Sequence, residues 1–316
     1  MTRVHRGDQA FDSDSLYGTE VEMPFSGTRS FMRRRLSRDL SGVDYAVMGI
    51  PYDLSTSGRP GARLGPEALR RATSQLSWGE VWPWGFDPFD RLAVVDYGDV
   101  QYQRGQPQEM LEAVLAQARA ALSAGSRLVG LGGDHLVTYP LLKAHAEKHG
   151  PLALIQFDAH RDTAKSSFLD HGSFVRFAMD EGLIDPHRSI QVGIRTYYDL
   201  DDPITVLHRP WIRENGVAAL VAEIERVTGG LPCYLTFDVD CLDPAFAPGT
   251  GTPVVDGLLP HEVIDTIRAL TGPDIVGMDV VELSPPYDPT EVSALLGASV
   301  VLEHLCAVAS RRPPRA

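Results

Sequence analysis

Short apolar runs alternate with amphipathic segments along most of this chain, and this alternation constrains its fold more than any other feature. The runs are rich in Val, Ile and Leu, and most are continuously apolar instead of alternating with polar residues. Such runs are typical of parallel strands that are buried on both faces of a sheet. We predict strands at Tyr45–Ile50, Leu92–Val95, Arg127–Leu131, Leu152–Phe157, Ile190–Ile194, Cys233–Phe237 and Ile275–Val281.

The segments between these runs repeat their apolar residues with the spacing of an amphipathic helix. We predict helices at Gln108–Ser123, Pro140–His149, Val217–Val227, His261–Leu270 and Val292–Ala309. Strand–helix alternation predicts an α/β fold, a three-layer sandwich with a mostly parallel central sheet. No repeat or linker interrupts the pattern, so we expect a polar N-terminal arm over residues 1–40, packed on a neighbouring subunit, and a single domain over residues 41–316.

The composition indicates which kinds of partner and which cellular compartment to expect. A net charge of −13 argues against a nucleic-acid or anionic-membrane surface and is compatible with a small cationic substrate. No apolar run approaches the ~20 residues that span a bilayer, and the N-terminus lacks the apolar core of a secretory signal. We therefore expect a cytoplasmic protein. The three cysteines are expected to be buried thiols, because Cys233, Cys241 and Cys306 offer no disulfide framework.

Carboxylates and histidines directly follow three of the predicted strands. One strand ends in Asp158, His160 and Asp162, which occupy alternate positions and would point the same way on an extended segment. Another ends in Asp238 and Asp240. A third ends in two glycines, which allow a sharp turn, followed by Asp134 and His135. Each group alone also has a structural interpretation, as a solvated strand end, a loop cap or a structural histidine.

The coincidence of these three groups favours a metal site over the structural interpretations. In open parallel sheets, ligands bind beyond the carboxyl ends of the strands. Buried carboxylates are costly there unless they are paired or bind a cation. Oxygen and imidazole ligands without thiolate suit Mn²⁺, Ni²⁺ or Fe²⁺, and this number of ligands suits two ions better than one. Asp243, just before a proline, fits a loop cap better than a ligand.

The segments GGDH, DAHRD and FDVDCLDPAFAPGTGTP resemble the three signature blocks of the ureohydrolases, the family of arginase and agmatinase. The similarity extends from SGRPGARLGPEALR through VVELSPPYD, and it is strongest to bacterial agmatinases. The resemblance implies an arginase-like fold and an enzyme that hydrolyses a guanidino compound to an amine and urea. Agmatine, which yields putrescine for polyamine biosynthesis, is the first candidate substrate. The family also implies two Mn²⁺ per subunit, with Ni²⁺ as an alternative, and a homo-oligomer, either a trimer or a hexamer.

The resemblance also assigns the metal ligands by position. One ion would be bound by His135, Asp158, Asp162 and Asp238. The other would be bound by Asp158, His160, Asp238 and Asp240, so that Asp158 and Asp238 bridge the two ions. A hydroxide between the ions would attack the guanidinium carbon.

Three further residues receive roles from the same resemblance. Glu282 matches the carboxylate that clamps the planar guanidinium, for which we expect two parallel hydrogen bonds. His171 matches the histidine that protonates the leaving amine; without the resemblance, a surface loop position would be preferred. Asp134 would orient a metal ligand, although a turn or helix cap is equally compatible with its position.

Arg161 departs from the family pattern, because agmatinases usually carry a small residue at this position. Since it alternates with His160 and Asp162, we expect Arg161 to point outward and to pair with a surface carboxylate. Two alternatives to agmatine hydrolysis remain. One is hydrolysis of another guanidino compound, such as 4-guanidinobutanoate, another guanidino acid or guanidine. The other is a catalytically silent subunit, which the intact set of ligands argues against.

Overall fold

One parallel sheet organises the molecule. The computed structural model describes residues 23, 25–76, 79–197 and 201–314. Within them, eight strands form a single sheet in the order β2-β1-β3-β8-β7-β4-β5-β6, and every neighbouring pair is parallel. The strands are β1 (Tyr45–Gly49), β2 (Val94–Asp99), β3 (Arg127–Leu131), β4 (Ala153–Phe157), β5 (Ile190–Ile194), β6 (Thr205–His208), β7 (Pro232–Asp238) and β8 (Asp274–Val281).

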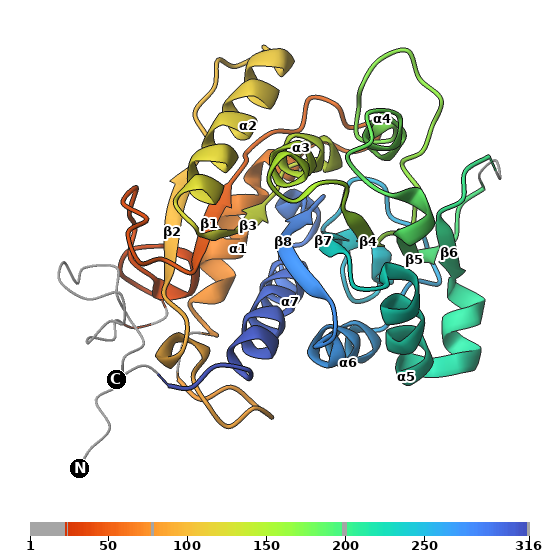
Figure 1. Ribbon diagram of the computed structural model, residues 1–316. Helices are drawn as coiled ribbons and strands as arrows, with labels where there is room; N and C mark the ends of the chain where they lie inside the picture. Colours follow the sequence, from red (N-terminus) through yellow and green to blue (C-terminus); the bar gives the residue numbers. More distant parts are fainter. Residues whose placement is uncertain (1–22, 24, 77–78, 198–200, 315–316) are drawn as a thin grey trace.

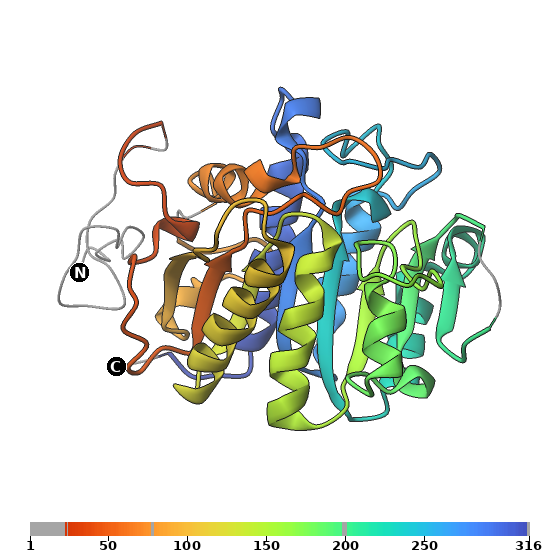
Figure 2. The ribbon, with the colours of Figure 1, turned by 90° about the horizontal axis from the view of Figure 1, so that it is seen from above.

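Helices cover both faces of the sheet and make a three-layer α/β sandwich, as the sequence predicts (Figure 1). One layer contains α2 (Pro107–Ser123), α3 (Thr138–His149) and α4 (Phe174–Asp180), onto which Figure 2 looks. The other contains α1 (Gly65–Thr73), α5 (Arg209–Thr228), α6 (Pro260–Ala269) and α7 (Val292–Ala309). Short 3₁₀ turns join the elements: η1 (Phe31–Arg33), η2 (Ala62–Leu64), η3 (Pro88–Asp90), η4 (His135–Val137), η5 (Pro186–Arg188), η6 (Val239–Cys241) and η7 (Pro285–Tyr287).

Each face of the sheet packs an apolar cluster against its helix layer. The helix α7 illustrates this burial. It is apolar and long enough to cross a membrane, yet 72% of it is buried inside the protein, where it packs against α1 and α6. It is therefore a core helix. The three cysteines are free and buried, as expected.

The prediction from the sequence missed three elements, and it placed β2 at Leu92–Val95 instead of Val94–Asp99. The strand β6 is short and lies at the sheet edge, so it has no long apolar run. The helix α1 begins with Gly65 and Pro66, which suggest a loop, and α4 spans only seven residues. The predicted helix Val217–Val227 matches the part of α5 that follows a kink at Gly216 (φ 75°), and the part before the kink, from Arg209, was not predicted.

The predicted N-terminal arm lies partly outside the described residues, because residues 1–22 and 24 are not among them. Its later part packs on the protein's own sheet. Phe31 and Met32 are fully buried in an apolar cluster, and Leu36 bridges to Asp96 in β2. Packing of the arm on a neighbouring subunit stays a prediction.

Candidate metal centre

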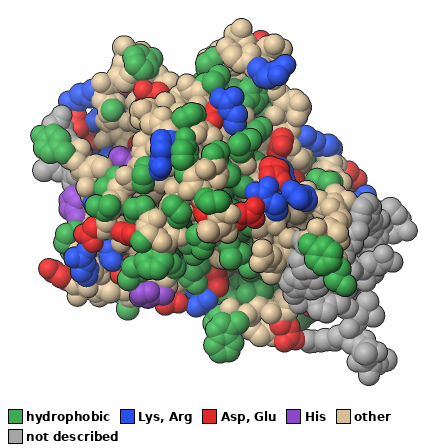
Figure 3. All heavy atoms as spheres, turned by 180° about the vertical axis from the view of Figure 1, so that it is seen from behind, with side chains coloured by type: hydrophobic (Ala, Val, Ile, Leu, Met, Phe, Trp, Pro, Cys, Tyr) green, Lys and Arg blue, Asp and Glu red, His purple; other side chains and the backbone are tan. Residues whose placement is uncertain are grey.

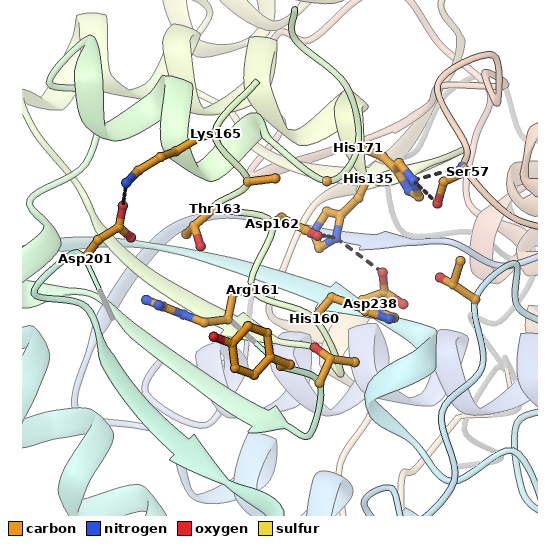
Figure 4. Close-up of a pocket in the computed structure, with 15 residues that line it drawn as sticks. Ser57, His135, His160, Arg161, Asp162, Thr163, Lys165, His171, Asp201 and Asp238 are labelled. Carbon is orange, nitrogen blue, oxygen red and sulfur yellow. Dashed lines mark hydrogen bonds and ion pairs between the residues drawn. The ribbon is translucent and has the colours of Figure 1, made fainter. Parts of the chain in front are cut away.

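The residues that follow β3, β4 and β7 meet at the carboxyl end of the sheet. They border a cavity of about 540 Å³, into which His135, His160, Asp162 and Asp238 project (Figure 4). The sheet order brings β7 and β4 side by side, with β3 separated from β7 by β8 alone. Residues more than 100 positions apart in the sequence therefore share one site.

His135 is delivered to the site by a sharp turn at the end of β3. Gly133 makes this turn possible, because a Cβ atom there would lie 1.7 Å from the carbonyl oxygen of Tyr52. Asp134 then caps η4, accepting a hydrogen bond from the backbone N–H of Leu136 (3.2 Å). His135 follows as the first residue of η4 and is 1% exposed.

The contacts of the His135 ring leave Nδ1 available to bind a cation. Nδ1 lies 3.0–3.2 Å from carboxylate oxygens of Asp158, Asp162 and Asp238, and it is buried without a hydrogen-bond partner. Nε2 lies 2.9 Å from Oγ1 of Thr236, whose hydroxyl donates to Asp279 at 2.6 Å. Because the single Thr236 proton is used there, Nε2–H of His135 must donate to Thr236. The lone pair of Nδ1 is then left for a metal ion.

A second group of possible ligands adjoins the first. Nδ1 of His160 lies 3.0 Å from Asp240 and 3.5 Å from Asp158. Asp158 therefore belongs to both groups, which are formed by His135, Asp158 and Asp162 on one side and Asp158, His160 and Asp240 on the other. All six predicted ligands thus lie together. Asp238 lies beside His135, and its predicted contact with the second ion stays a prediction.

The buried carboxylates of the cluster would be stabilised by positive charge. Burial, together with neighbouring carboxylates, raises the pKa of Asp238 and Asp240, and it raises the pKa of Asp162 to about 7. Burial alone would lower the pKa of His160, but hydrogen bonds with Asp158 and Asp240 raise it to about 12. Four buried carboxylates and an unpartnered imidazole nitrogen fit divalent cations, which would neutralise the carboxylates.

His171 and Glu282 form a pair beside this cluster. Nδ1 of His171 lies 3.0 Å from Oε1 of Glu282, and Nε2 accepts a hydrogen bond from the backbone N–H of Ser57 at 3.0 Å. Nδ1 must therefore carry the proton in this pair. The Oε1 atom of Glu282 also accepts from the backbone N–H of His135 (2.8 Å), whereas Oε2 is buried without a partner. Both lone pairs of Oε1 are therefore in use in this structure, and the two predicted hydrogen bonds from Glu282 to a guanidinium stay a prediction.

Two carboxylates of the predicted site occupy the left-handed region of backbone conformation. Asp162 has a φ of 53° and Glu282 a φ of 60°. Non-glycine residues adopt such angles rarely, and among the described residues Met32, Arg33, Asp256 and Glu291 also do so, away from the cavity. The carboxylate of Asp162 lies 3.0 Å from Nδ1 of His135.

Asp134 and Asp243 both act as caps. Besides capping η4, Asp134 accepts hydrogen bonds from the backbone N–H and the hydroxyl of Ser55, at 2.9 and 2.8 Å. Burial and the nearby charge of Glu282 raise the pKa of Asp134 to about 7. Asp134 thus fastens the loop after β1 to η4, and its predicted effect on a ligand would act through His135. Asp243 accepts from the backbone of Ala245 and Gly257, as a loop cap.

The expectation that Arg161 points outward is wrong. Its side chain is 2% exposed and pairs with Asp202, which is equally buried (Nη2–Oδ1, 2.5 Å). Its guanidinium points away from His135 and Asp238, toward the end of the cavity where Asp201 lies (Figure 4). The alternation of a strand does not apply here, because β4 ends at Phe157 and the chain bends before Arg161.

Several residues of the site were not identified from the sequence: Ser57, Gln156, Gln191, Asp202, Thr236 and Asp279. A signal was present for two of them. Gln156 and Thr236 are polar residues inside apolar strand runs, each two positions before a predicted metal ligand. On a strand, that spacing places them on the same side as the ligand. The contacts of the others depend on the tertiary fold.

The site gathers candidate ligands for two metal ions, and comparison with known proteins gives the family of this chain. The sequence pattern of the arginase family matches residues 43–307. The chain is 50% identical over 310 residues to an agmatinase of Chromobacterium violaceum, covering 97% of this chain and 96% of that protein.

Two solved structures extend the comparison. A hypothetical agmatinase from Burkholderia thailandensis has a TM-score of 0.94 and 49% identity, covering 96% of this chain and 98% of that one. A proclavaminate amidino hydrolase from Streptomyces clavuligerus has a TM-score of 0.87 and 36% identity, with 91% and 99% covered. This chain therefore belongs to the arginase family, which its sequence motifs also resemble, and it is an amidinohydrolase.

Proposed function

We propose that this enzyme hydrolyses agmatine to putrescine and urea. The observation that carries the proposal is the near-complete match to an agmatinase at 50% identity, in a chain whose six predicted ligands lie together beside one cavity. The cavity is large enough for a small linear diamine derivative. The intact cluster argues against a silent subunit, because loss of any of these carboxylates or histidines would be the simplest route to inactivity.

The metal centre would supply the nucleophile. When bound, divalent cations would lower the pKa of a water molecule, so that hydroxide would be available near neutral pH. The cluster of oxygen and imidazole donors, without thiolate, favours Mn²⁺, with Ni²⁺ as the alternative. Removal of metal with a chelator should abolish urea release, and Mn²⁺ should restore it. Full activity in a verified metal-free sample would refute this mechanism.

Glu282 and His171 would act on the substrate itself. The free Oε2 of Glu282 can accept a hydrogen bond from the cationic guanidinium and so place its carbon beside the metal ions. Nδ1–H of His171 faces Glu282, and burial of both groups strengthens this contact. Burial would lower the pKa of His171, but the bond to Glu282 raises it to about 9. Because Nε2 accepts from the backbone N–H of Ser57, the proton that His171 can deliver to the leaving amine is the one on Nδ1.

A guanidino acid is the second candidate substrate, and the charges at the far end of the cavity support it. Lys165 and Arg161 line that end, and Arg176 lies close by. Asp201 and Asp202 pair with these cations, as Lys165 and Asp201 do in Figure 4. Because the pairing cancels most of the positive charge, we retain agmatine. Measurement of kcat/KM for agmatine, 4-guanidinobutanoate, other guanidino acids and guanidine decides between them; a preference for an acid would overturn the choice.

The oligomeric state, the cellular location and the absence of nucleic-acid or membrane binding are also proposals. We propose a cytoplasmic homo-oligomer, a trimer or hexamer, that binds neither nucleic acid nor membrane. Exposed aromatic residues such as Phe25 and Trp82 support subunit contacts. The face in Figure 3 mixes acidic, basic and apolar side chains, which supports the absence of a nucleic-acid surface there. Light scattering of the purified protein tests the oligomeric state.

A further inference from the structure

A row of buried polar side chains connects Asp158 with Arg161. Gln156 in β4 and Gln191 in β5 are opposite each other in the sheet, and both are fully buried. Nε of Arg161 donates to Oε1 of Gln191 (2.7 Å), and Nε2 of Gln191 donates to Oε1 of Gln156 (2.6 Å). Nε2 of Gln156 then donates to Oδ2 of Asp158 (2.7 Å). Three hydrogen bonds thus run in series from a guanidinium to a carboxylate.

The chemistry of the two ends fixes the direction of this row. A guanidinium can only donate and a carboxylate can only accept, so each amide must turn its oxygen toward Arg161 and its nitrogen toward Asp158. The second N–H of Gln191 donates to the backbone oxygen of Arg161 at 2.7 Å, and Nη2 of Arg161 pairs with Asp202. A flip of either amide would break at least two buried hydrogen bonds, which is costly in the interior.

The end of the row reaches a carboxylate that both ligand groups share. A carboxylate can bridge two metal ions by offering one oxygen to each. Oδ1 of Asp158 accepts from the backbone N–H of His160 at 2.6 Å, and Oδ2, held by Gln156, lies 3.2 Å from Nδ1 of His135. Each oxygen therefore has one donor from the protein and one lone pair left for an ion.

We infer that Arg161, acting through Gln191 and Gln156, is a positioning residue that fixes which oxygen of Asp158 faces each metal ion. Arg161 lines the cavity, but its charge is paired with Asp202, and its role is to support the metal centre. The inference rests on the metal dependence proposed above and not on the identity of the substrate. Partners that orient metal ligands in this way typically contribute about 10- to 100-fold in metal affinity.

The test measures metal binding and not activity. Gln156→Met keeps the length of the side chain and removes the donor, and Arg161→Lys removes the planar fork that reaches both partners. Arg70→Lys is the matched control. Arg70 is buried and paired with Asp96 in β2, at the opposite edge of the sheet. Dissociation constants for Mn²⁺ and Ni²⁺ are measured by equilibrium dialysis of metal-free protein, with a melting curve for each variant.

We expect about 10-fold weaker binding or more for Gln156→Met and Arg161→Lys, and wild-type binding for Arg70→Lys even where its Tm falls. The double variant should bind no more weakly than Gln156→Met alone, because both changes break the same row. Wild-type affinity in Gln156→Met would overturn the inference, as would additive effects in the double variant. If Arg161→Lys does not fold, Gln191→Met takes its place. Absence of activity toward agmatine would contradict the proposed substrate and would leave the inference about metal binding unaffected.

Discussion

Oε1 of Glu282 lies 3.0 Å from Nδ1 of His171, so the residue expected to hold the substrate and the residue expected to protonate the product are already in contact. Ser57 holds the opposite side of the His171 ring through its backbone N–H and hydroxyl. The proton of the pair therefore lies between the imidazole and the carboxylate. A guanidinium bound to Glu282 would therefore lie close to the proton that His171 is expected to donate.

Replacement of His171 by Asn should lower kcat more than it changes KM. A proton donor acts in the transition state, and general acid catalysis typically contributes about 10²- to 10⁴-fold. Steady-state kinetics of urea release measure both constants. Added imidazole should rescue part of the lost rate. An unchanged kcat would remove the proton-donor role.

Glu282→Gln should weaken both substrate binding and turnover, because the carboxylate contacts the reacting group in both states. Loss of a hydrogen bond to a charged group costs about 1.5–3 kcal/mol, or roughly 10- to 160-fold in kcat/KM. Glu303→Gln is the control. Glu303 is also buried and accepts hydrogen bonds from Trp84 and Arg268, away from the cavity. Equal kinetic losses in the two variants would point to general destabilisation instead of a substrate contact.

Asp238→Asn should reduce metal content and kcat far more than Asp243→Asn. Asp238 lies 3.2 Å from Nδ1 of His135 among the ligands, whereas Asp243 bonds only backbone N–H groups of its own loop. Metal analysis and kinetics are compared at equal protein concentration. Melting curves control for the loop cap that Asp243→Asn weakens. Similar metal contents in the two variants would contradict the ligand assignment.

Acid should destabilise the fold through His145, which lies in α3 away from the metal centre. Burial lowers its pKa from 6.5 to about 4, so between these values the unfolded chain binds a proton that the folded chain does not. Stability should therefore be full above about pH 6.5 and fall as pH decreases toward 4, by up to about 3 kcal/mol from this residue.

Urea unfolding at several pH values measures this contribution. His145→Leu should lose less stability on acidification than the wild type, and the exposed His261→Leu should behave as the wild type. The comparison removes effects of the metal ligands, which all three proteins share. Parallel curves for wild type and His145→Leu would show that His145 does not titrate as expected.

The positions of the metal ligands could be predicted from the sequence better than the contacts of Arg161. The strands Arg127–Leu131 and Ile190–Ile194 were predicted with their observed bounds, because continuous apolar runs depend on local composition. The carboxyl ends of β3, β4 and β7 then bring the ligands together through the parallel sheet alone. Arg161 was misplaced because its environment is made by β5 and by Asp202, and neither is visible in the local pattern.

The left-handed backbone at Asp162 and Glu282 has a consequence for how this protein can change over evolution. Glycine tolerates such angles best, and other residues there cost of order 1–3 kcal/mol each. The fold gives up stability at two positions, of which Asp162 lines the cavity and Glu282 contacts His171. Substitution of either residue by glycine would relax the backbone while removing a functional group. Selection for thermal stability and selection for catalysis therefore oppose each other at these two positions.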